Sequence, residues 1–274
     1  MQLKPLLGAR LRPSVDNRRM VDAALDPVRF YDGAYSRDGE DAALYSRWRA
    51  LGAVGKADHV IALCARAGVW AGGRPASTLE VGCGDGALLS ELHRRRFGGR
   101  LCGVEITHAA VEIAAARHEI QSVERYDGQR LPCPDRAYEL GVLSHVLEHV
   151  PDPAALLAEA ARACRAVVLE VPLEANLSAR RAGKRRHAHE VGHLQRLHRA
   201  GARAVVAEAG LLVVAELEDP LPLAVHRFFA RTRRARALAT AKWALRASLH
   251  RLAPALARRL FTVHYACLCL PPGA

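Results

Sequence analysis

Short apolar runs alternate with segments of helical periodicity over most of the chain. The strand-like runs cover 78–82, 101–105, 121–126, 138–144, 165–171, 211–218 and 262–270. Helical patterns at 86–96, 108–117, 153–164 and 195–209 lie among the first six of these runs. Because strands that alternate with helices usually pair in parallel, this pattern predicts an α/β fold with a mostly parallel sheet.

The N-terminal end departs from this alternation. Residues 1–39 are basic and rich in turn formers, while residues 41–67 follow a helical pattern. Gly52 and Gly55 are expected to interrupt that pattern, which therefore predicts one or two helices. We expect an N-terminal arm and helical cap over residues 1–70, followed by the main domain.

The main domain, residues 71–274, contains a helical insertion at about 222–260, before the last apolar run. Its leucines recur at helical spacing, with basic residues between them: Leu238, Leu245, Leu249, Leu252, Leu256 and Leu260. This spacing predicts an amphipathic, basic helix that bends near Pro254. Three interpretations of the leucines remain open: packing on the sheet or over a pocket, contact with an anionic membrane surface, or part of an RNA-binding helix.

The first apolar run of the main domain ends in a glycine-rich turn. Three alternate glycines stand there, Gly82, Gly84 and Gly86. Glycine takes positive φ and has no Cβ, so the backbone can turn sharply and lie against a ligand. The dinucleotide fingerprint needs its third glycine one residue later, where Ala87 stands, and Glu80 and Asp85 place two carboxylates beside the turn. These carboxylates would repel a pyrophosphate and attract a ligand that carries an ammonium and a sulfonium.

Further elements follow the glycines in order. The run at 101–105 ends in Glu105, roughly twenty residues past the glycines, the offset at which a carboxylate meets a ribose diol. Next come Tyr-Asp-Gly-Gln-Arg-Leu-Pro at 126–132 and Gly-Val-Leu-Ser-His-Val-Leu-Glu-His-Val-Pro-Asp-Pro at 141–153. Over about residues 30–218, these motifs resemble the class I S-adenosylmethionine-dependent methyltransferases, in particular the methyltransferase type 11-like domains.

The resemblance implies a fold, a cofactor and a set of site residues. The fold would be a Rossmann-like, doubly wound, mostly parallel seven-stranded sheet with an antiparallel final strand. The cofactor would be S-adenosyl-L-methionine, bound by Tyr31, Glu80, Gly82, Gly84, Gly86, Glu105, Asp127 and Ser144. In this comparison Asp127 lies near the adenine amino group, Ser144 lies beside the transferred methyl, and Tyr31 belongs to an entry segment at 30–35.

Catalysis by such a protein needs little acid–base chemistry. The sulfonium already activates its methyl group, so the protein mainly has to align the acceptor with the methyl carbon and the sulfur. Where a hydroxyl or a protonated amine is the acceptor, His145, His149 and Glu190 are candidate bases. The sequence leaves open whether oxygen, nitrogen, carbon or sulfur receives the methyl group.

A second motif, His189-Glu-Val-Gly-His193, satisfies the HExxH pattern of zinc metalloproteases. Gly192 weakens a helix there, and the preceding residues 182–188 read as a cationic loop. A metzincin extension would need Gly at 196 and His at 199, yet both are arginine. We therefore expect no metal site, and we expect the motif to line or cap the acceptor pocket or to serve the structure.

The composition limits the cellular compartment and the structural class that we expect for the protein. The chain has 274 residues and is 50% hydrophobic, enough for one substantial core. Its seven cysteines form neither a disulfide framework nor a paired CxxC site, which suits a reducing cytosol. The N-terminus lacks a long apolar segment, and no run approaches the length that crosses a bilayer. We expect a cytoplasmic protein, with peripheral membrane contact as an option.

The formal net charge of +12 is regional. Residues 227–259 carry ten Lys and Arg and no acid, and residues 177–203 carry eight with Glu190 as their one acid. Such regions attract a carboxylated or phosphorylated acceptor, an anionic lipid surface or RNA. We rank a methyltransferase for a small-molecule acceptor first, an RNA-directed methyltransferase second, and a noncatalytic protein that binds the cofactor third.

Overall fold

The computed structural model describes residue 35 and residues 39–273. Within them, seven strands form one sheet in the order β3-β2-β1-β4-β5-β7-β6. Their bounds are β1 (Ser77–Val81), β2 (Arg100–Glu105), β3 (Ser122–Arg125), β4 (Tyr138–Ser144), β5 (Cys164–Pro172), β6 (Leu212–Asp219) and β7 (His264–Leu270). The first five strands pair in parallel, and β7 runs antiparallel to both β5 and β6. The predicted sheet with its antiparallel final strand is confirmed.

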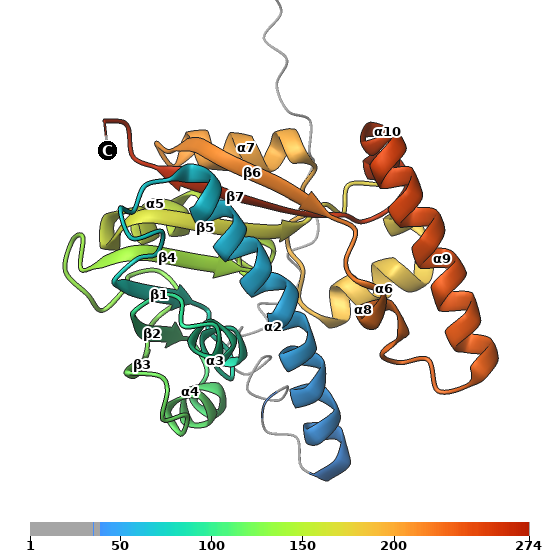
Figure 1. Ribbon diagram of the computed structural model, residues 1–274, viewed down its shortest axis with the longest axis horizontal. Coiled ribbons are helices and arrows are strands. Elements are labelled where there is room, and N and C mark those ends of the chain that lie inside the picture. The colour runs from blue at the N-terminus through green and yellow to red at the C-terminus, as the bar shows by residue number, and fades with distance from the viewer. Residues whose placement is uncertain (1–34, 36–38, 274) are drawn as a thin grey trace, which may run out of the picture.

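Helices cover both faces of the sheet (Figure 1). They are α2 (Gly39–Ala67), α3 (Ala87–Arg94), α4 (His108–Ala115), α5 (Pro153–Ala163), α6 (Ala182–Glu190), α7 (Arg199–Glu208), α8 (Leu223–Arg227), α9 (Arg233–Leu252) and α10 (Pro254–Leu260), with short 3-10 turns at Leu147–His149 and Ser178–Arg180. Side chains alternate between the faces along each strand, which produces two apolar clusters. One holds residues of α2 and α3 and the other holds residues of α5 and α7.

The helix α2 runs without a break through Gly52 and Gly55, so the expected interruption is wrong. Each glycine costs about 1 kcal/mol relative to alanine in a helix. Burial of Ala53, Ala57 and Val60 against the rest of the fold offsets this cost. The helix crosses one face of the sheet in Figure 1 and reaches β5, β6 and β7.

The insertion forms α8, α9 and α10 beyond the carboxyl ends of the parallel strands (Figure 1). Pro254 begins α10 directly after α9 ends, so the bend predicted there is confirmed. The Trp48 ring of α2 packs against the insertion, 5.1 Å from the Phe228 ring and 5.0 Å from the Phe229 ring between centroids. The insertion therefore closes over the end of the sheet.

Four leucines of the insertion lie on its outer side. Leu238, Leu245, Leu252 and Leu256 are exposed, and Leu252 is 82% exposed. The interpretation that these four leucines pack on the sheet or over a pocket is therefore wrong. In the part of the chain that the structure describes, no helix combines the length and the apolar character that crossing a bilayer requires.

Candidate functional site

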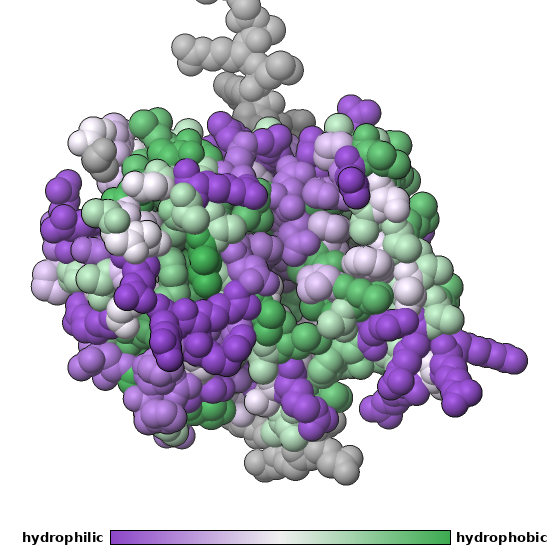
Figure 2. Space-filling model, viewed as in Figure 1, coloured by the Kyte–Doolittle hydropathy of each residue, from purple (hydrophilic) through white to green (hydrophobic). Residues whose placement is uncertain are grey.

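A pocket with a volume of 590 Å³ lies at the carboxyl ends of the central strands. Its walls come from α2 and the glycine loop on one side and from α6, α8 and α9 on the other, and the ends of β4 and β5 contribute residues between them. Figure 2 shows this face hollowed between the sheet and α9, with both hydrophilic and apolar side chains around the hollow. Open α/β sheets bind their ligands outside the carboxyl ends of the strands, so this pocket is the candidate site.

The glycine loop connects β1 to α3 at one end of the pocket. Gly82, Gly84 and Gly86 have φ values of 71°, 54° and 76°, a region that other residues adopt only under strain. A Cβ at Gly82 would lie 2.8 Å from Val146 Cγ2, and one at Gly86 would lie 2.5 Å from Ile120 Cδ1. Both the turn and the close packing around it therefore require glycine, as the sequence predicted for a ligand-binding loop.

Glu80 lies in the pocket wall just before the first of these glycines. Its side chain is buried, and Oε2 has no hydrogen-bond partner among the described residues. Burial, reinforced by the neighbouring acids Asp85 and Glu105, raises the pKa of Glu80 to about 8. Buried polar atoms normally have partners, so an unpartnered carboxylate oxygen in a pocket indicates a site for a cationic ligand.

Glu105 closes β2 on the far side of the glycine loop. The Gly84 N–H donates to its Oε2 at 2.9 Å, and the N–H groups of Ile106 and Thr107 donate to its Oε1 at 2.7 and 3.2 Å. Burial nevertheless raises the pKa of the Glu105 carboxyl. The carboxylate orders the loop, and its remaining lone pairs are what a ribose hydroxyl would need. Glu105 does not line the pocket.

The structure does not bring Asp127 to the pocket. Its exposed carboxylate accepts hydrogen bonds from the N–H groups of Gln129 at 2.8 Å and Arg130 at 2.7 Å, which lower its pKa. It therefore caps its own turn, as an ordinary turn aspartate does. Tyr31, the other cofactor candidate outside the glycine region, falls outside the described residues.

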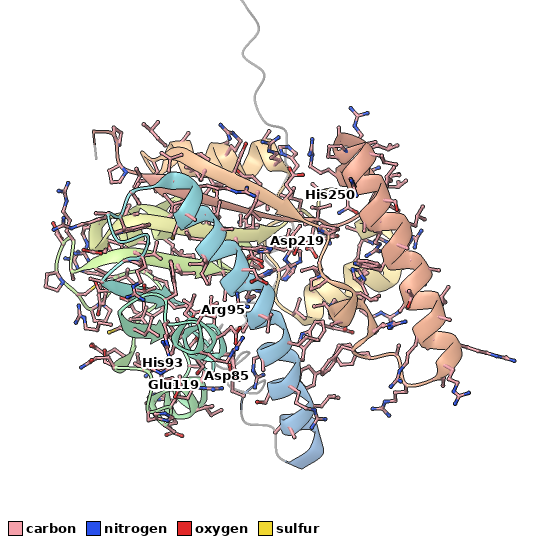
Figure 3. All side chains as sticks on the ribbon, viewed as in Figure 1. Asp85, His93, Arg95, Glu119, Asp219 and His250 are labelled. Atoms are coloured by element: carbon pink, nitrogen blue, oxygen red, sulfur yellow. The ribbon has the colours of Figure 1, made fainter. Side chains whose placement is uncertain are left out.

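Tyr35, four residues after Tyr31, lines the pocket and was missed by the sequence analysis. Its hydroxyl lies above Gly84, and the Arg49 guanidinium sits 4.8 Å from the centre of its ring. Arg49 Nε in turn donates to Asp85 Oδ2 at 2.7 Å, which ties α2 to the glycine loop. Figure 3 shows Asp85 beside α2. Tyr35 belongs to the segment 30–35 in which the resemblance implies a tyrosine.

Ser144 ends β4 at the other side of the pocket, and His145 follows it directly. Ser144 is buried, and its hydroxyl has no hydrogen-bond partner in the described part of the chain. His145 has a φ of 61°, which is rare for a residue other than glycine and is typical of functional sites. Burial opposes protonation of His145, but Glu148 and Glu170 outweigh it and raise its pKa.

His149 also lines the pocket, one residue after the buried Glu148. Burial lowers the pKa of His149. The Glu148 carboxyl is held ionised against its burial by His145, which brings its pKa to about 2. The structure thus places both candidate histidines in the pocket wall.

Glu190 is not brought to the pocket, because it is exposed and does not line it. The segment expected to be a cationic loop is the helix α6, which ends at Glu190, and Gly192 has a φ of 75°. His193 therefore leaves the helix and turns into the pocket, while His189 stays exposed. The two histidines of the HExxH motif do not share a helical face, so the motif lacks the geometry of a zinc protease.

Three further ionisable residues join the pocket wall and were not singled out from the sequence. They are His59 of α2, Glu170 of β5 and His264 of β7. His264 Nδ1 lies 3.2 Å from Glu170 Oε1 and 3.1 Å from His145 Nε2. The signal that could have found Glu170 is a carboxylate inside an otherwise apolar strand.

The sequence was compared with families of known proteins. Residues 56–216 match the methyltransferase domain family, which is more than half of the chain. The chain belongs to this methyltransferase domain family. The predicted resemblance to methyltransferases is thereby confirmed.

Individual methyltransferase relatives are distant. The Ubiquinone biosynthesis O-methyltransferase of Acinetobacter baylyi is 30% identical over 96 residues, which cover 33% of this chain and 38% of that protein. The chain spans less than half of the length of the curated relatives it matches, for example 27% and 42% of two others.

Solved structures share the fold. The geranyl diphosphate C-methyltransferase of Streptomyces coelicolor, solved with S-adenosyl-L-homocysteine, superposes with a TM-score of 0.56 at 14% identity, covering 79% of this chain and 76% of that one. The cyclase SpnF superposes with a TM-score of 0.53 at 16% identity, covering 79% and 82%. A cyclase on the same fold means that the activity has to be argued from the site.

Proposed function

We propose that the protein is an S-adenosylmethionine-dependent methyltransferase that acts on a small-molecule acceptor. The observation that carries the proposal is the composition of the pocket. At one end, beside the glycine loop, a buried Glu80 oxygen has no hydrogen-bond partner among the described residues and offers an acceptor for an ammonium or a neighbour for a sulfonium. At the other end, Ser144, His145 and His149 face the same space.

These residues fit the cofactor that the family uses. Glu80 and the glycine loop would hold its methionine end, with Tyr35 beside the loop, and Glu105, which accepts from the Gly84 N–H but does not line the pocket, would meet its ribose. When bound, the cofactor supplies an activated methyl group. The chain's own contribution is to exclude water, to place the acceptor beside Ser144, and to accept a proton at His145 or His149 where the acceptor has one to lose.

The acceptor is proposed to be anionic. Lys184 lies in α6, Arg196 follows that helix, Arg246 extends from α9, and all three line the pocket opposite the glycine loop. Cations gathered in a pocket attract carboxylate or phosphate groups. The ubiquinone biosynthesis and geranyl diphosphate enzymes named above act on small molecules by their names, which supports a small acceptor here.

Titration calorimetry of the purified protein tests the cofactor, with one S-adenosylmethionine expected per chain. Transfer of labelled methyl into a metabolite extract, compared with transfer into total RNA, tests the acceptor class. Glu80→Gln should weaken binding, whereas Glu124→Gln on an exposed stretch of β3 should not. Label in RNA would favour the RNA-directed alternative, and binding without label in any fraction would favour a noncatalytic protein.

We further propose that the insertion contacts an anionic membrane surface. The exposed Leu238, Leu245 and Leu252 recur every seven residues along α9, which places them on one side of that helix, and Leu256 is exposed on α10. Figure 2 shows apolar side chains along that edge and hydrophilic side chains projecting at the end where α9 begins. A leucine stripe beside arginines is typical of helices that lie in a bilayer interface. A helix that binds RNA would need only its basic residues for that contact.

The cytoplasm is the proposed compartment. All seven cysteines are free thiols, and six of them are buried. Thiols persist in reducing compartments, where disulfides are rare.

A further inference from the structure

Three metal-ligating side chains meet in the wall of the pocket. Glu148 and His149 belong to the 3-10 turn after β4, and His193 follows α6. One ligand atom from each lies within 4.8 Å of the other two. The His149 and His193 rings stand edge to face, with their centres 4.8 Å apart. A carboxylate and two imidazoles at this separation can converge on one ion after small side-chain rotations.

The Nδ1 atoms of the two histidines are held by acceptors. His193 Nδ1 lies 2.7 Å from Glu174 Oε2, and His149 Nδ1 lies 3.2 Å from the Gly192 carbonyl oxygen. Carboxylate and carbonyl oxygens only accept, so Nδ1 carries the proton in both rings. The lone pair of each ring then lies at Nε2. Metal-binding histidines have this arrangement, in which an outer oxygen fixes the tautomer and the orientation of the ring.

Glu148 adds an unpartnered oxygen. Its Oε1 lies 2.9 Å from His145 Nδ1, which orients the carboxylate, but its Oε2 has no hydrogen-bond partner among the described residues. The residue is 1% exposed. A buried ionised oxygen without a partner is costly, and a cation bound between Glu148, His149 and His193 would remove that cost.

A neighbouring group of side chains could also hold a metal ion but differs from the first group in one respect. It consists of His145, Glu170 and His264. Its ligand atoms already lie 3.1 to 3.4 Å from one another and satisfy each other as hydrogen bonds. His59 Nδ1 holds the second Glu170 oxygen at 3.1 Å. No oxygen of this second group is left without a partner in the described chain. We therefore do not expect it to compete with the first group for a metal ion.

We propose that Glu148, His149 and His193 bind a divalent first-row transition metal ion of the Zn²⁺ class. Two imidazoles and one carboxylate suit such an ion and leave coordination positions open toward the pocket. The motif that suggested a zinc protease thus contributes one ligand, His193, while His189 contributes none. The proposal departs from the expectation, based on the motif alone, that the chain has no metal site.

The open positions give the ion a role that rests on the proposed methyl transfer. An acceptor oxygen bound there would be fixed beside Ser144, and a bound hydroxyl would lose its proton more readily. His149 would then be a ligand and would no longer be available as a proton acceptor. Binding of the ion itself does not depend on methyl transfer, so the two proposals can fail separately.

Cobalt is the probe, because Co²⁺ takes zinc-type sites and absorbs visible light. The intact protein, treated with a chelator and desalted, is titrated with Co²⁺ and then with Zn²⁺ as a competitor. We expect one Co²⁺ per chain, visible bands typical of a low-coordinate site, and displacement by one Zn²⁺. Cofactor binding, measured by calorimetry on the same samples, reports separately on the proposed function.

Substitutions of the proposed ligands test where the ion binds. His149→Gln and His193→Gln should abolish the stoichiometric bands, and Glu174→Gln should weaken Co²⁺ binding by about 10- to 100-fold, as loss of an outer hydrogen bond does at other metal sites. His189→Gln, the matched change in the same motif, should leave the titration unchanged. Circular dichroism and thermal melts in chelator show whether each variant folds. Absence of stoichiometric binding by the unmodified protein, or equal loss in His189→Gln and His193→Gln, would overturn the proposal.

Discussion

His59 and Glu170 are 111 residues apart in sequence, yet His59 Nδ1 lies 3.1 Å from Glu170 Oε2 in a buried contact between α2 and β5. The other ring nitrogen, Nε2, lies 3.0 Å from Asp219 Oδ2 at the end of β6, which Figure 3 shows near α2. Burial disfavours the imidazolium, but the two carboxylates outweigh it and raise the pKa of His59 to about 9. A charged contact therefore ties the N-terminal helix to the sheet.

This contact should make stability depend on pH. The pKa of His59 is about 9 in the folded protein and about 6.5 in an unfolded chain. A raised pKa means that the stabilisation is complete below about pH 6.5 and is lost as pH rises through 9. We expect the free energy of unfolding in urea to fall by up to about 3 kcal/mol over that range. His59→Gln should flatten this part of the profile, and an unchanged slope in that variant would contradict the assignment.

Ionisation of Glu80 should make cofactor binding stronger as the pH rises, whereas the His59 contact makes the fold less stable as the pH rises. Its pKa of about 8, raised mainly by burial, keeps much of the carboxyl protonated at neutral pH. A cationic ligand favours the ionised form, so affinity for S-adenosylmethionine should rise up to about tenfold per pH unit below pH 8 and level off above it.

Calorimetry in two buffers with different ionisation enthalpies measures the proton released by this coupling. We expect up to one proton per cofactor bound at pH 7. Glu80→Gln should abolish the release that the carboxyl contributes and weaken binding at pH 8. Equal proton release by the two proteins would remove Glu80 from the coupling.

Local patterns predicted the strands and the glycine loop because each depends on neighbouring residues. An apolar run forms a buried strand, and a sharp turn over a ligand needs glycine. The continuity of α2 was missed because the cost of Gly52 and Gly55 is local, whereas the burial that offsets it comes from the rest of the fold. Propensity gives way to tertiary packing in such cases.

The histidine-rich wall of the pocket could not be predicted for the same reason. His59, Glu170 and His264 come from α2, β5 and β7, and only the sheet order brings them together. Glu190 was a candidate because it stands inside a known motif, yet the turn at Gly192 directs His193 into the pocket and leaves Glu190 exposed. A motif specifies spacing along the chain, and the backbone between its residues decides where they point.

Glu105 should contribute to cofactor affinity through the ribose. Glu105→Gln replaces one carboxylate oxygen by an amide donor, so a ribose hydroxyl loses its acceptor, and so do the loop N–H groups that bond to that oxygen, either that of Gly84 or those of Ile106 and Thr107. We expect binding to weaken by about 1–3 kcal/mol. S-adenosylmethionine and S-adenosylhomocysteine share the ribose, so calorimetry should show the same loss for both. A folded variant with unchanged dissociation constants for both ligands would exclude the ribose role.

The insertion should bind anionic vesicles weakly and neutral vesicles little. The arginines at the start of α9 and just before it are exposed, and the leucine stripe begins one turn later. Co-sedimentation with phosphatidylglycerol vesicles should recover more protein than phosphatidylcholine vesicles do. A variant with Gln at Arg231, Arg233, Arg234 and Arg236 should lose the preference for anionic lipid. A variant with Gln at Leu245 and Leu252 should also bind less although its charge is unchanged, since an interfacial helix needs its apolar face. Equal recovery of the unmodified protein and both variants would exclude membrane contact, and binding of RNA that falls steeply with salt and survives the leucine change would assign the insertion to RNA instead.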